Sequence, residues 1–327
     1  MKIAFCGVRH AHVFSLYHMA SQNPDTQITG AWEEDDKARE KAEEIIKEKF
    51  YDSYEALLED ESVDAVAIGD YYGIRGERII KALKAGKHVI ADKPVCTDIG
   101  ELREIERLSS EKGLTVSCLL DLRFDAAVRL ARDIVRSDEI GEVHAINFTG
   151  QHPLDYGNRP MWYFEEGKHG GTFNDIAIHG IDAVKMITGL NTLTPHLARQ
   201  WNAFAKAEKN FKDCAQLIGK YENGAGLMAD VSYSVPAPIG YKLPGYWRFS
   251  IFGDKGMIEF KVGSGEVMIA KNGGGEAEIR RAEETLENCL TDFMKEAGNE
   301  KSEFKTEDTL SSSLTALNIQ KAADETI

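Results

Sequence analysis

The chain opens with Lys2-Ile3-Ala4-Phe5-Cys6-Gly7, a short apolar run that ends in glycine. This run predicts a buried strand, and the apolar spacing over residues 11–20 predicts a helix directly after it. A strand that ends in glycine and leads into a helix is typical of a site for a dinucleotide pyrophosphate. The N–H groups and the dipole at the start of such a helix both favour an anion.

Strands and helices continue to alternate after this first pair. We expect strands over residues 27–32, 64–68, 88–91 and 115–119. We expect helices over residues 36–49, 54–59, 77–85 and 98–112. Nearly continuous apolar strands separated by helices indicate a parallel sheet that is covered on both faces, so the first domain is predicted to be a doubly wound Rossmann sheet.

The pattern changes beyond a helix predicted over residues 125–137. Strands then succeed one another over residues 144–151, 197–201, 215–221, 226–234, 247–252, 256–261 and 267–270. Further helices are predicted over residues 174–188, 284–298 and 307–323. The fold class is therefore α/β, with a second α/β domain built on a large, mostly antiparallel open sheet.

Two domains follow from this change of pattern. We expect an NAD-binding domain over residues 1–122 and a domain for substrate binding and oligomerisation over residues 123–327. The C-terminal helices are free to pack back on the first domain.

Composition excludes several classes of partner. The 327 residues include 39 basic and 54 acidic side chains, and 39 − 54 gives a net charge of −15. Such a charge repels phosphate backbones, so we expect neither nucleic acid nor an anionic membrane as a partner. The five cysteines contain no CxxC pair and predict buried free thiols. With no signal peptide and no long apolar span, we expect a cytoplasmic protein.

The glycine-rich fingerprint of dinucleotide sites is incomplete in this chain. Gly7-Val8-Arg9-His10-Ala11-His12 keeps only the first glycine of GxGxxG. Arg9 takes the place of the second glycine and would give a charge-assisted contact to phosphate. His10 and His12 are also spaced as metal ligands, but no third ligand lies near them in the sequence, so we predict no metal site.

The second strand ends in an acidic run that begins with Glu33. A carboxylate at this point accepts both hydroxyls of a ribose and repels a 2′-phosphate, which favours NAD over NADP. The alternative is that the acidic run only caps the following helix.

Two further segments carry candidate catalytic groups. Lys93, followed by a proline, comes directly after the fourth strand, where groups face the ligand crevice of an open sheet. Asp175 and His179 are four residues apart, so both project from one face of the predicted helix and suit proton transfer. The alternatives are a structural lysine, and an aspartate that complements the helix dipole beside a hydrogen-bonded histidine.

Together these segments resemble the glucose–fructose oxidoreductase/inositol dehydrogenase family, Gfo/Idh/MocA. The resemblance rests on Asp64-Ala65-Val66-Ala67-Ile68, on the run from Ala82 to Val89, on Asp92-Lys93-Pro94, and on Gly170-Gly171 followed by Asp175, His179 and Asp182. It implies that Lys93 and His179 act with the nicotinamide and that Asp175 acts on the substrate. It also implies a cis Lys93–Pro94 bond and an open sheet that forms a subunit interface, in a homodimer or homotetramer.

From the motifs and the resemblance together, we expect the cofactor to be lined by Gly7, Val8, Arg9, His10, Glu33, Asp70, Tyr71, Asp92 and Lys93. The chain departs from the family pattern at some of these positions and at others nearby in the two signatures. Asp92 replaces the glutamate of Glu-Lys-Pro, and Asp70-Tyr71-Tyr72 stands where Thr-Pro-Asn is common. Arg75 replaces a histidine, and Ala177 replaces a glycine.

The segment from Gln151 to Tyr163 mixes aromatic and hydrogen-bonding side chains, as sugar sites do. Its candidate substrate residues are His152, Asp155, Arg159 and Trp162. A dimer contact or an ordinary surface loop is the alternative for this segment.

We expect an NAD-dependent dehydrogenase that acts on a secondary alcohol of a sugar or cyclic polyol. One alternative is an enzyme that retains NAD and couples transient oxidation to elimination or epimerisation. The other is a non-catalytic NAD-binding sensor.

Overall fold

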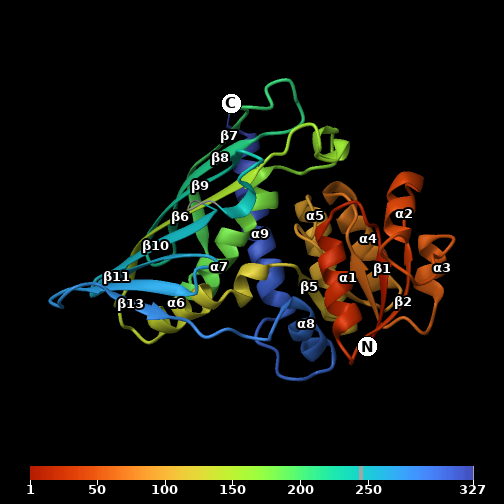
Figure 1. Cartoon of the computed structure of the whole chain (residues 1–327), viewed down its shortest axis with the longest axis horizontal. Coiled ribbons are helices and arrows are strands. Elements are labelled where there is room, and N and C mark those ends of the chain that lie inside the picture. Colours follow the sequence, from red (N-terminus) through yellow and green to blue (C-terminus); the bar gives the residue numbers. More distant parts are fainter. Residues whose placement is uncertain (243–245, 327) are drawn as a thin grey trace. The chain divides into compact units, whose positions relative to one another are not determined.

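A computed structural model of the chain describes residues 1–242 and 246–326. The chain divides into two compact units, and Figure 1 labels most of their helices and strands. Unit 1 comprises Met1–Leu119, Gly167–Gly170 and Asn288–Ser313, and unit 2 comprises Leu120–Glu166, Gly171–Glu287 and Leu314–Ile327. The domain boundary near residue 122 stays a prediction.

Unit 1 contains a parallel sheet of five strands in the order β2-β1-β3-β4-β5. The strands are β1 (Lys2–Cys6), β2 (Gln27–Trp32), β3 (Ala65–Ile68), β4 (His88–Ala91) and β5 (Val116–Cys118). The helices are α1 (His12–Gln22), α2 (Asp36–Glu43), α3 (Tyr54–Glu59), α4 (Tyr72–Lys84), α5 (Ile99–Lys112) and α8 (Cys289–Ala297). This confirms the predicted Rossmann sheet, whose strand order reverses between β1 and β3, the place where such sheets bind ligands.

Local chemistry explains where α2, α3 and α5 begin and where α5 ends. Asp35, Ser53 and Asp98 each accept a backbone N–H at the start of their helices, and Gly113 ends α5 with a φ of 63°. The predicted helix over residues 36–49 was too long, because α2 ends at Glu43 and buries only Ala42. α4 begins at Tyr72 rather than at residue 77, without any side-chain cap that the sequence could have signalled.

Unit 2 is built on a sheet of eight strands in the order β13-β12-β11-β10-β6-β9-β8-β7. The strands are β6 (Val143–Pro153), β7 (Leu193–Trp201), β8 (Cys214–Tyr221), β9 (Gly226–Val235), β10 (Trp247–Gly253), β11 (Gly256–Lys261), β12 (Glu266–Lys271) and β13 (Glu278–Arg281). Neighbours are antiparallel except β6 and β9, which confirms the predicted mostly antiparallel sheet. β13 was not predicted, because its polar sequence has no apolar alternation.

Several short helices accompany this sheet: η1 (Asp121–Phe124), α6 (Ala126–Arg136), η2 (Met161–Phe164), η3 (Phe173–Ala177), α7 (Ile178–Thr188) and η4 (Gly240–Lys242). α9 (Thr306–Asp324) is shared between the two units. The predicted helix over residues 174–188 is a π-helical turn, η3, followed by α7. The helix predicted from residue 284 begins at Cys289, where Asn288 and Thr291 form a capping box.

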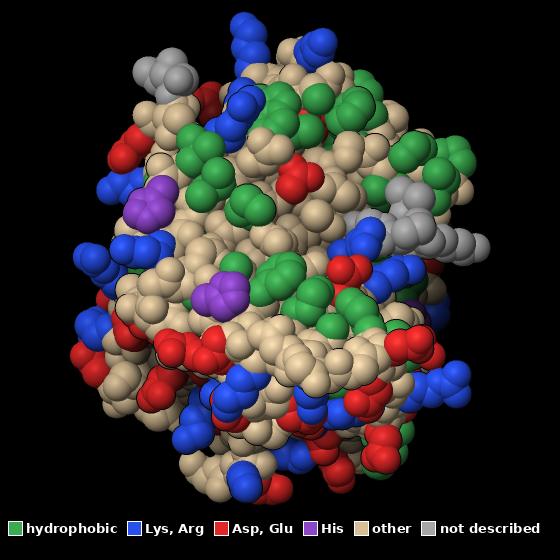
Figure 2. Space-filling model, turned by 90° about the vertical axis from the view of Figure 1, so that its left-hand side faces the viewer, with side chains coloured by type: hydrophobic (Ala, Val, Ile, Leu, Met, Phe, Trp, Pro, Cys, Tyr) green, Lys and Arg blue, Asp and Glu red, His purple; other side chains and the backbone are tan. Residues whose placement is uncertain are grey.

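One face of the large sheet packs against helices, and the other is open. α6 contacts β11 and β12, and α7 contacts β6, where a Cβ at Gly180 would lie 2.4 Å from the Phe148 ring. Figure 2 looks onto the side where the strands of this sheet lie, and hydrophobic side chains gather there among uncharged ones. Leu197, Ile218 and Met228, on β7, β8 and β9, are 42%, 45% and 55% exposed.

The five cysteines are buried free thiols, as the sequence predicted. Within residues 1–242 and 246–326, no helix has the length and apolar character needed to cross a membrane.

Candidate functional site

The cofactor-side candidates of unit 1 meet at the carboxyl edge of its sheet. Gly7 follows β1, Asp70 follows β3, and Asp92 follows β4, so three neighbouring strands deliver them to one place. Gly7 has a φ of 70°, and a Cβ there would lie 2.5 Å from the Cβ of Asp70. The one glycine kept from the fingerprint is therefore needed both for its backbone conformation and for this close approach.

Glu33 lies against the loop that follows Gly7. Its Oε2 accepts the N–H of Val8 at 2.7 Å, and its Oε1 accepts from Arg9 Nε and from the Asp35 N–H, both at 2.8 Å. The carboxylate is 4% exposed, so its oxygens are engaged within the protein. The alternative role of the acidic run, capping the following helix, is performed by Asp35. Its Oδ1 accepts the N–H of Ala38 at the start of α2.

Two other charged groups border Glu33. Arg9 lies between Glu33 and the Tyr71 ring, with its guanidinium 5.6 Å from the ring centroid. The more exposed neighbour, Glu34, pairs with Arg78 at 3.0 Å. Sequence reasoning missed Glu34 and Arg78 as members of this corner. The acidic run did contain Glu34, whereas nothing around Arg78 marked it.

Asp70 is completely buried, and burial together with the nearby charge of Glu33 raises its pKa to about 6. Its Oδ2 and the Nε of Arg78 are 3.7 Å apart, and neither makes a hydrogen bond within the described part of the chain. Buried polar atoms of this kind favour a polar ligand close by. α1 also begins without a side-chain cap, which leaves its N-terminus suited to an anion. This corner therefore fits the pyrophosphate and ribose of a dinucleotide.

Arg75 joins the ends of β3 and β4. Its Nε donates to Asp70 O at 2.8 Å, and its Nη2 donates to Asp92 Oδ2 at 3.1 Å. Its Nη1 donates to the carbonyl oxygens of Lys93 and of Pro94, the latter at 3.2 Å. The side chain is fully buried, and the Lys93–Pro94 peptide is cis, as the resemblance implies. Arg75, which replaces the histidine of the family pattern, thus holds the backbone of the candidate lysine, Lys93, in place.

Asp92 is the centre of a buried polar network. Its Oδ1 accepts the N–H of Lys93 at 2.7 Å, and its Oδ2 also accepts from His10 Nδ1, whose Nε2 is 3.1 Å from the Tyr72 hydroxyl. Burial opposes ionisation of Asp92, but His10 and Arg75 hold its pKa well below the usual range. Burial lowers the pKa of His10 to about 3, although the neighbouring carboxylate of Asp92 acts in the opposite direction.

In unit 2, Asp175 and His179 are both buried, at 2% and 9% exposure. Asp175 lies in the π-helical turn η3, and its Oδ2 accepts a hydrogen bond from the hydroxyl of Tyr233 on β9. The His179 ring lies 6.1 Å from the Trp247 ring. Tyr233 is a site residue that sequence reasoning missed, because a tyrosine in a strand pattern carries no special signal.

Arg123 and Asp182 fix the helix that carries His179. Arg123 donates from Nε at 2.8 Å and from Nη2 at 2.7 Å to the two carboxylate oxygens of Asp182. Both side chains are 3% exposed. Asp182, part of the signature in the sequence, thus anchors α7 to η1.

The four predicted substrate residues have different surroundings. Asp155 is exposed, has a φ of 51°, and holds a turn through Asn158. Trp162 is buried and stacks on Tyr163. Arg159 lies 5.6 Å from the Tyr233 ring centroid, and His152 lies 5.7 Å from the Trp247 ring. Arg159 and His152 therefore border the rings that contact Asp175 and His179, whereas Asp155 and Trp162 shape their own segment.

Lys93 belongs to unit 1, and Asp175 and His179 belong to unit 2. The structure brings the cofactor-side residues together within the first unit and Asp175 together with Tyr233 within the second. The joint catalytic set stays a prediction.

Comparison with known proteins agrees with both halves of the fold. Residues 1–119 match the oxidoreductase family with an NAD-binding Rossmann fold, and residues 128–259 match the GFO/IDH/MocA C-terminal domain. A solved structure from Erwinia carotovora atroseptica has a TM-score of 0.87 at 22% identity, covering 99% of this chain and 98% of that one. An oxidoreductase from Agrobacterium radiobacter, solved with NAD⁺, L-tartaric acid and magnesium, has a TM-score of 0.80 at 19% identity, covering 99% and 95%.

The curated relatives match this chain over only part of their length. Myo-inositol 2-dehydrogenase of Thermotoga maritima is 26% identical over 68% of this chain and 64% of its own length. The scyllo-inositol 2-dehydrogenase (NAD⁺) of Bacillus subtilis is 27% identical over 68% of this chain and 62% of its own. The matched part thus spans less than two thirds of either relative. Since the two family matches cover the parallel sheet and most strands of the antiparallel sheet, the chain belongs to the GFO/IDH/MocA oxidoreductase family.

Proposed function

We propose that this protein is an NAD-dependent oxidoreductase that transfers a hydride between nicotinamide and a secondary alcohol of a sugar or cyclic polyol. The buried network that fixes Lys93 at the carboxyl edge of the Rossmann sheet, beside the Gly7 loop, carries the proposal. Relatives named as inositol dehydrogenases, and a D-xylose dehydrogenase of Paenarthrobacter nicotinovorans, support the class of substrate.

Each candidate residue has a defined task in this proposal. Bound NAD supplies the hydride acceptor. Lys93 stabilises negative charge on the substrate oxygen, and His179 takes the hydroxyl proton. Asp175, which accepts a hydrogen bond from Tyr233, orients the substrate or the imidazole. Gly7, Val8 and the start of α1 hold the pyrophosphate.

The preference for NAD over NADP follows from the acidic corner after β2. Glu33 and Glu34 place two carboxylates there, which disfavour a 2′-phosphate, while Arg9 and Arg78 pair with them and reduce this repulsion. Glu33 also holds the Val8 N–H and Arg9, so its role includes shaping the loop as well as selecting the cofactor.

The test is turnover of a panel of cyclitols and aldoses with NAD, followed by the absorbance of the reduced nicotinamide. Lys93→Met and His179→Ala should each lower kcat/KM by roughly 10²–10⁴-fold. Lys84→Met and His196→Ala are the matched controls, since both side chains are exposed, and they should keep wild-type rates. Near-normal turnover in Lys93→Met or His179→Ala would remove that residue from the catalytic set.

We propose further that a second copy of the chain covers the open face of the large sheet in a homodimer or homotetramer. The exposed apolar residues Leu197, Ile218 and Met228 support this. A cytoplasmic location fits the five buried free thiols, because disulfides are rare in reducing compartments.

A further inference from the structure

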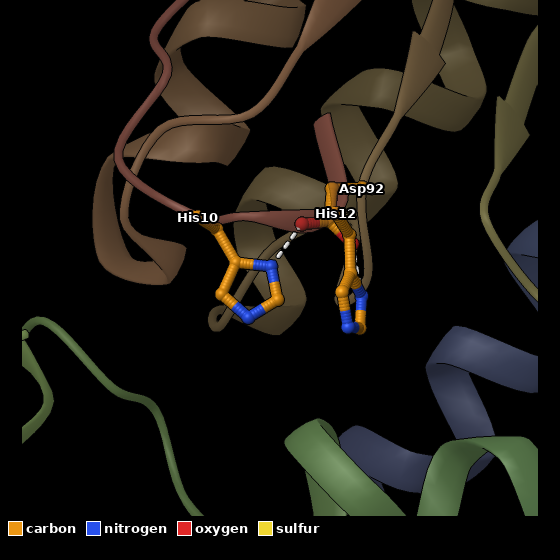
Figure 3. A group of neighbouring side chains, drawn as sticks. All are labelled: His10, His12 and Asp92. Atoms are coloured by element: carbon orange, nitrogen blue, oxygen red, sulfur yellow. Dashed lines mark hydrogen bonds and ion pairs between the residues drawn. The ribbon is translucent and has the colours of Figure 1, made fainter. Parts of the chain in front are cut away.

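His10, His12 and Asp92 form a compact group of metal-ligand side chains at the edge of the Rossmann sheet. One ligand atom from each residue lies within 4.8 Å of the other two. His10 is in the loop after β1, His12 is the first residue of α1, and Asp92 follows β4. Figure 3 shows the two imidazole rings side by side next to the carboxylate. The sequence offered no third ligand near the two histidines, but the fold supplies Asp92.

The spacing between the ligand atoms of His12 and Asp92 suits a small divalent cation. His12 Nδ1 and Asp92 Oδ1 are 3.4 Å apart. Two ligands of a tetrahedral zinc ion with bonds of about 2.1 Å are separated by about the same distance. The His10 and His12 rings are 4.4 Å apart, centroid to centroid. The His12 side chain is 45% exposed, so its ring can adjust and is reached by solvent.

Neighbouring groups orient these ligands as outer-shell partners do in metal sites. When His10 binds a metal through Nδ1, its Nε2–H is placed to donate to the Tyr72 hydroxyl, 3.1 Å away. Arg75 Nη2 and the Lys93 N–H hold the two oxygens of Asp92 at 3.1 and 2.7 Å. The hydrogen bond between His10 and Asp92 is then replaced by one bond from each residue to the metal.

The type of ligand selects the type of cation. Two imidazoles and one carboxylate suit Zn²⁺ and its neighbours Co²⁺ and Ni²⁺, whereas Mg²⁺ and Ca²⁺ prefer oxygen ligands. The positive charges of Arg75 and Lys93 lie close to the group and oppose the cation. Binding should therefore be weaker than in a structural zinc site.

We propose that His10, His12 and Asp92 form a binding site for one Zn²⁺-like transition metal ion, with an open position for water. The proposal rests on these side chains and not on the proposed dehydrogenase activity.

The experiment uses the full chain without a histidine tag, after removal of metal with a chelator. Zn²⁺ is titrated by calorimetry, and Co²⁺ is titrated while its visible absorption is recorded. We expect one ion per chain and a Co²⁺ spectrum typical of four-coordinate nitrogen and oxygen ligands. His12→Ala should weaken Zn²⁺ binding at least tenfold, because it removes a ligand while His10, Arg75 and the Lys93 N–H still hold the carboxylate of Asp92. Tyr72→Phe should weaken it by about 10-fold through His10.

His18→Ala is the matched control, since His18 is an exposed histidine in the same helix as His12. It should leave Zn²⁺ binding unchanged. Circular dichroism of each variant checks that it is folded. The proposal fails if the wild-type chain binds no Zn²⁺, if His12→Ala binds it as tightly as the wild type, or if His18→Ala loses as much affinity as His12→Ala.

Discussion

Arg75 offers the sharpest test of how the candidate lysine is held. Arg75→Met removes the buried cation that faces Asp92 and leaves three backbone carbonyls without their donor. Leaving one member of a buried ion pair alone costs about 3–5 kcal/mol. The carbonyls add to this, so we expect a loss of at least about 4 kcal/mol of unfolding free energy, a large share of the 5–15 kcal/mol typical of folded proteins.

Arg75→Lys separates charge from geometry. It keeps a positive charge but replaces the planar fork by a single ammonium group, so it cannot reach Asp70, Asp92 and the lysine–proline carbonyls together. We expect a smaller loss in unfolding free energy, about 2 kcal/mol, with kcat falling while NAD binding is retained. A fall in kcat without a loss of NAD binding would show that Arg75 positions Lys93, because general destabilisation would weaken both.

Urea unfolding followed by circular dichroism measures these losses. The matched control is Arg107→Met on α5, because Arg107 also pairs with two acidic side chains, Glu104 and Glu111, but is 49% exposed. Exposed pairs contribute about 0.2–1 kcal/mol each, so this control should lose little. The reasoning about Arg75 is refuted if Arg75→Met is no less stable than Arg107→Met.

Three further predictions follow from single groups. The pKa of Asp70, about 6 against the ordinary 3.8, means that the folded state favours the protonated carboxyl, so stability is lost as pH rises through about 6. The difference in unfolding free energy between Asp70→Asn and wild type should therefore shift in favour of Asp70→Asn by about 3 kcal/mol from about pH 4 to pH 8. Urea unfolding at each pH measures this difference, and a difference that does not change with pH would contradict the burial argument. Glu33→Gln should bring the dissociation constants of NAD and NADP closer together, and calorimetry that shows an unchanged ratio would exclude its role. Arg123→Met should cost about 3–5 kcal/mol of unfolding free energy by leaving Asp182 buried and unpaired, and a loss near zero would contradict it.

The sequence was sufficient for the two sheets because each has a clear periodicity. Buried runs such as residues 64–68 predict parallel strands, and alternating runs such as residues 226–234 predict an antiparallel sheet. The polar strand β13 and the early start of α4 escaped prediction because packing, and not local pattern, decides them.

The candidate site was predictable in its parts but not in its connections. The sequence singled out His10, Glu33 and Asp92 separately, since each follows a strand of the parallel sheet. It could not show that Asp92 would meet His10 and Arg75, because they lie 82 and 17 residues away along the chain. The link between Asp175 and Tyr233 depends in the same way on the pairing of η3 with β9, which no local motif encodes.

Direct detection of hydride transfer tests the central claim most closely. A panel of cyclitols and aldoses, each deuterated at a carbinol carbon, is incubated with the protein and NAD, and the nicotinamide is analysed by mass spectrometry. We expect deuterium in the reduced nicotinamide with at least one member of the panel, at equal initial rates in wild type and Lys84→Met and at a rate roughly 10²–10⁴-fold lower in His179→Ala. If NAD binds but none of the panel transfers deuterium, the oxidoreductase proposal is contradicted and a sensor of NAD is favoured.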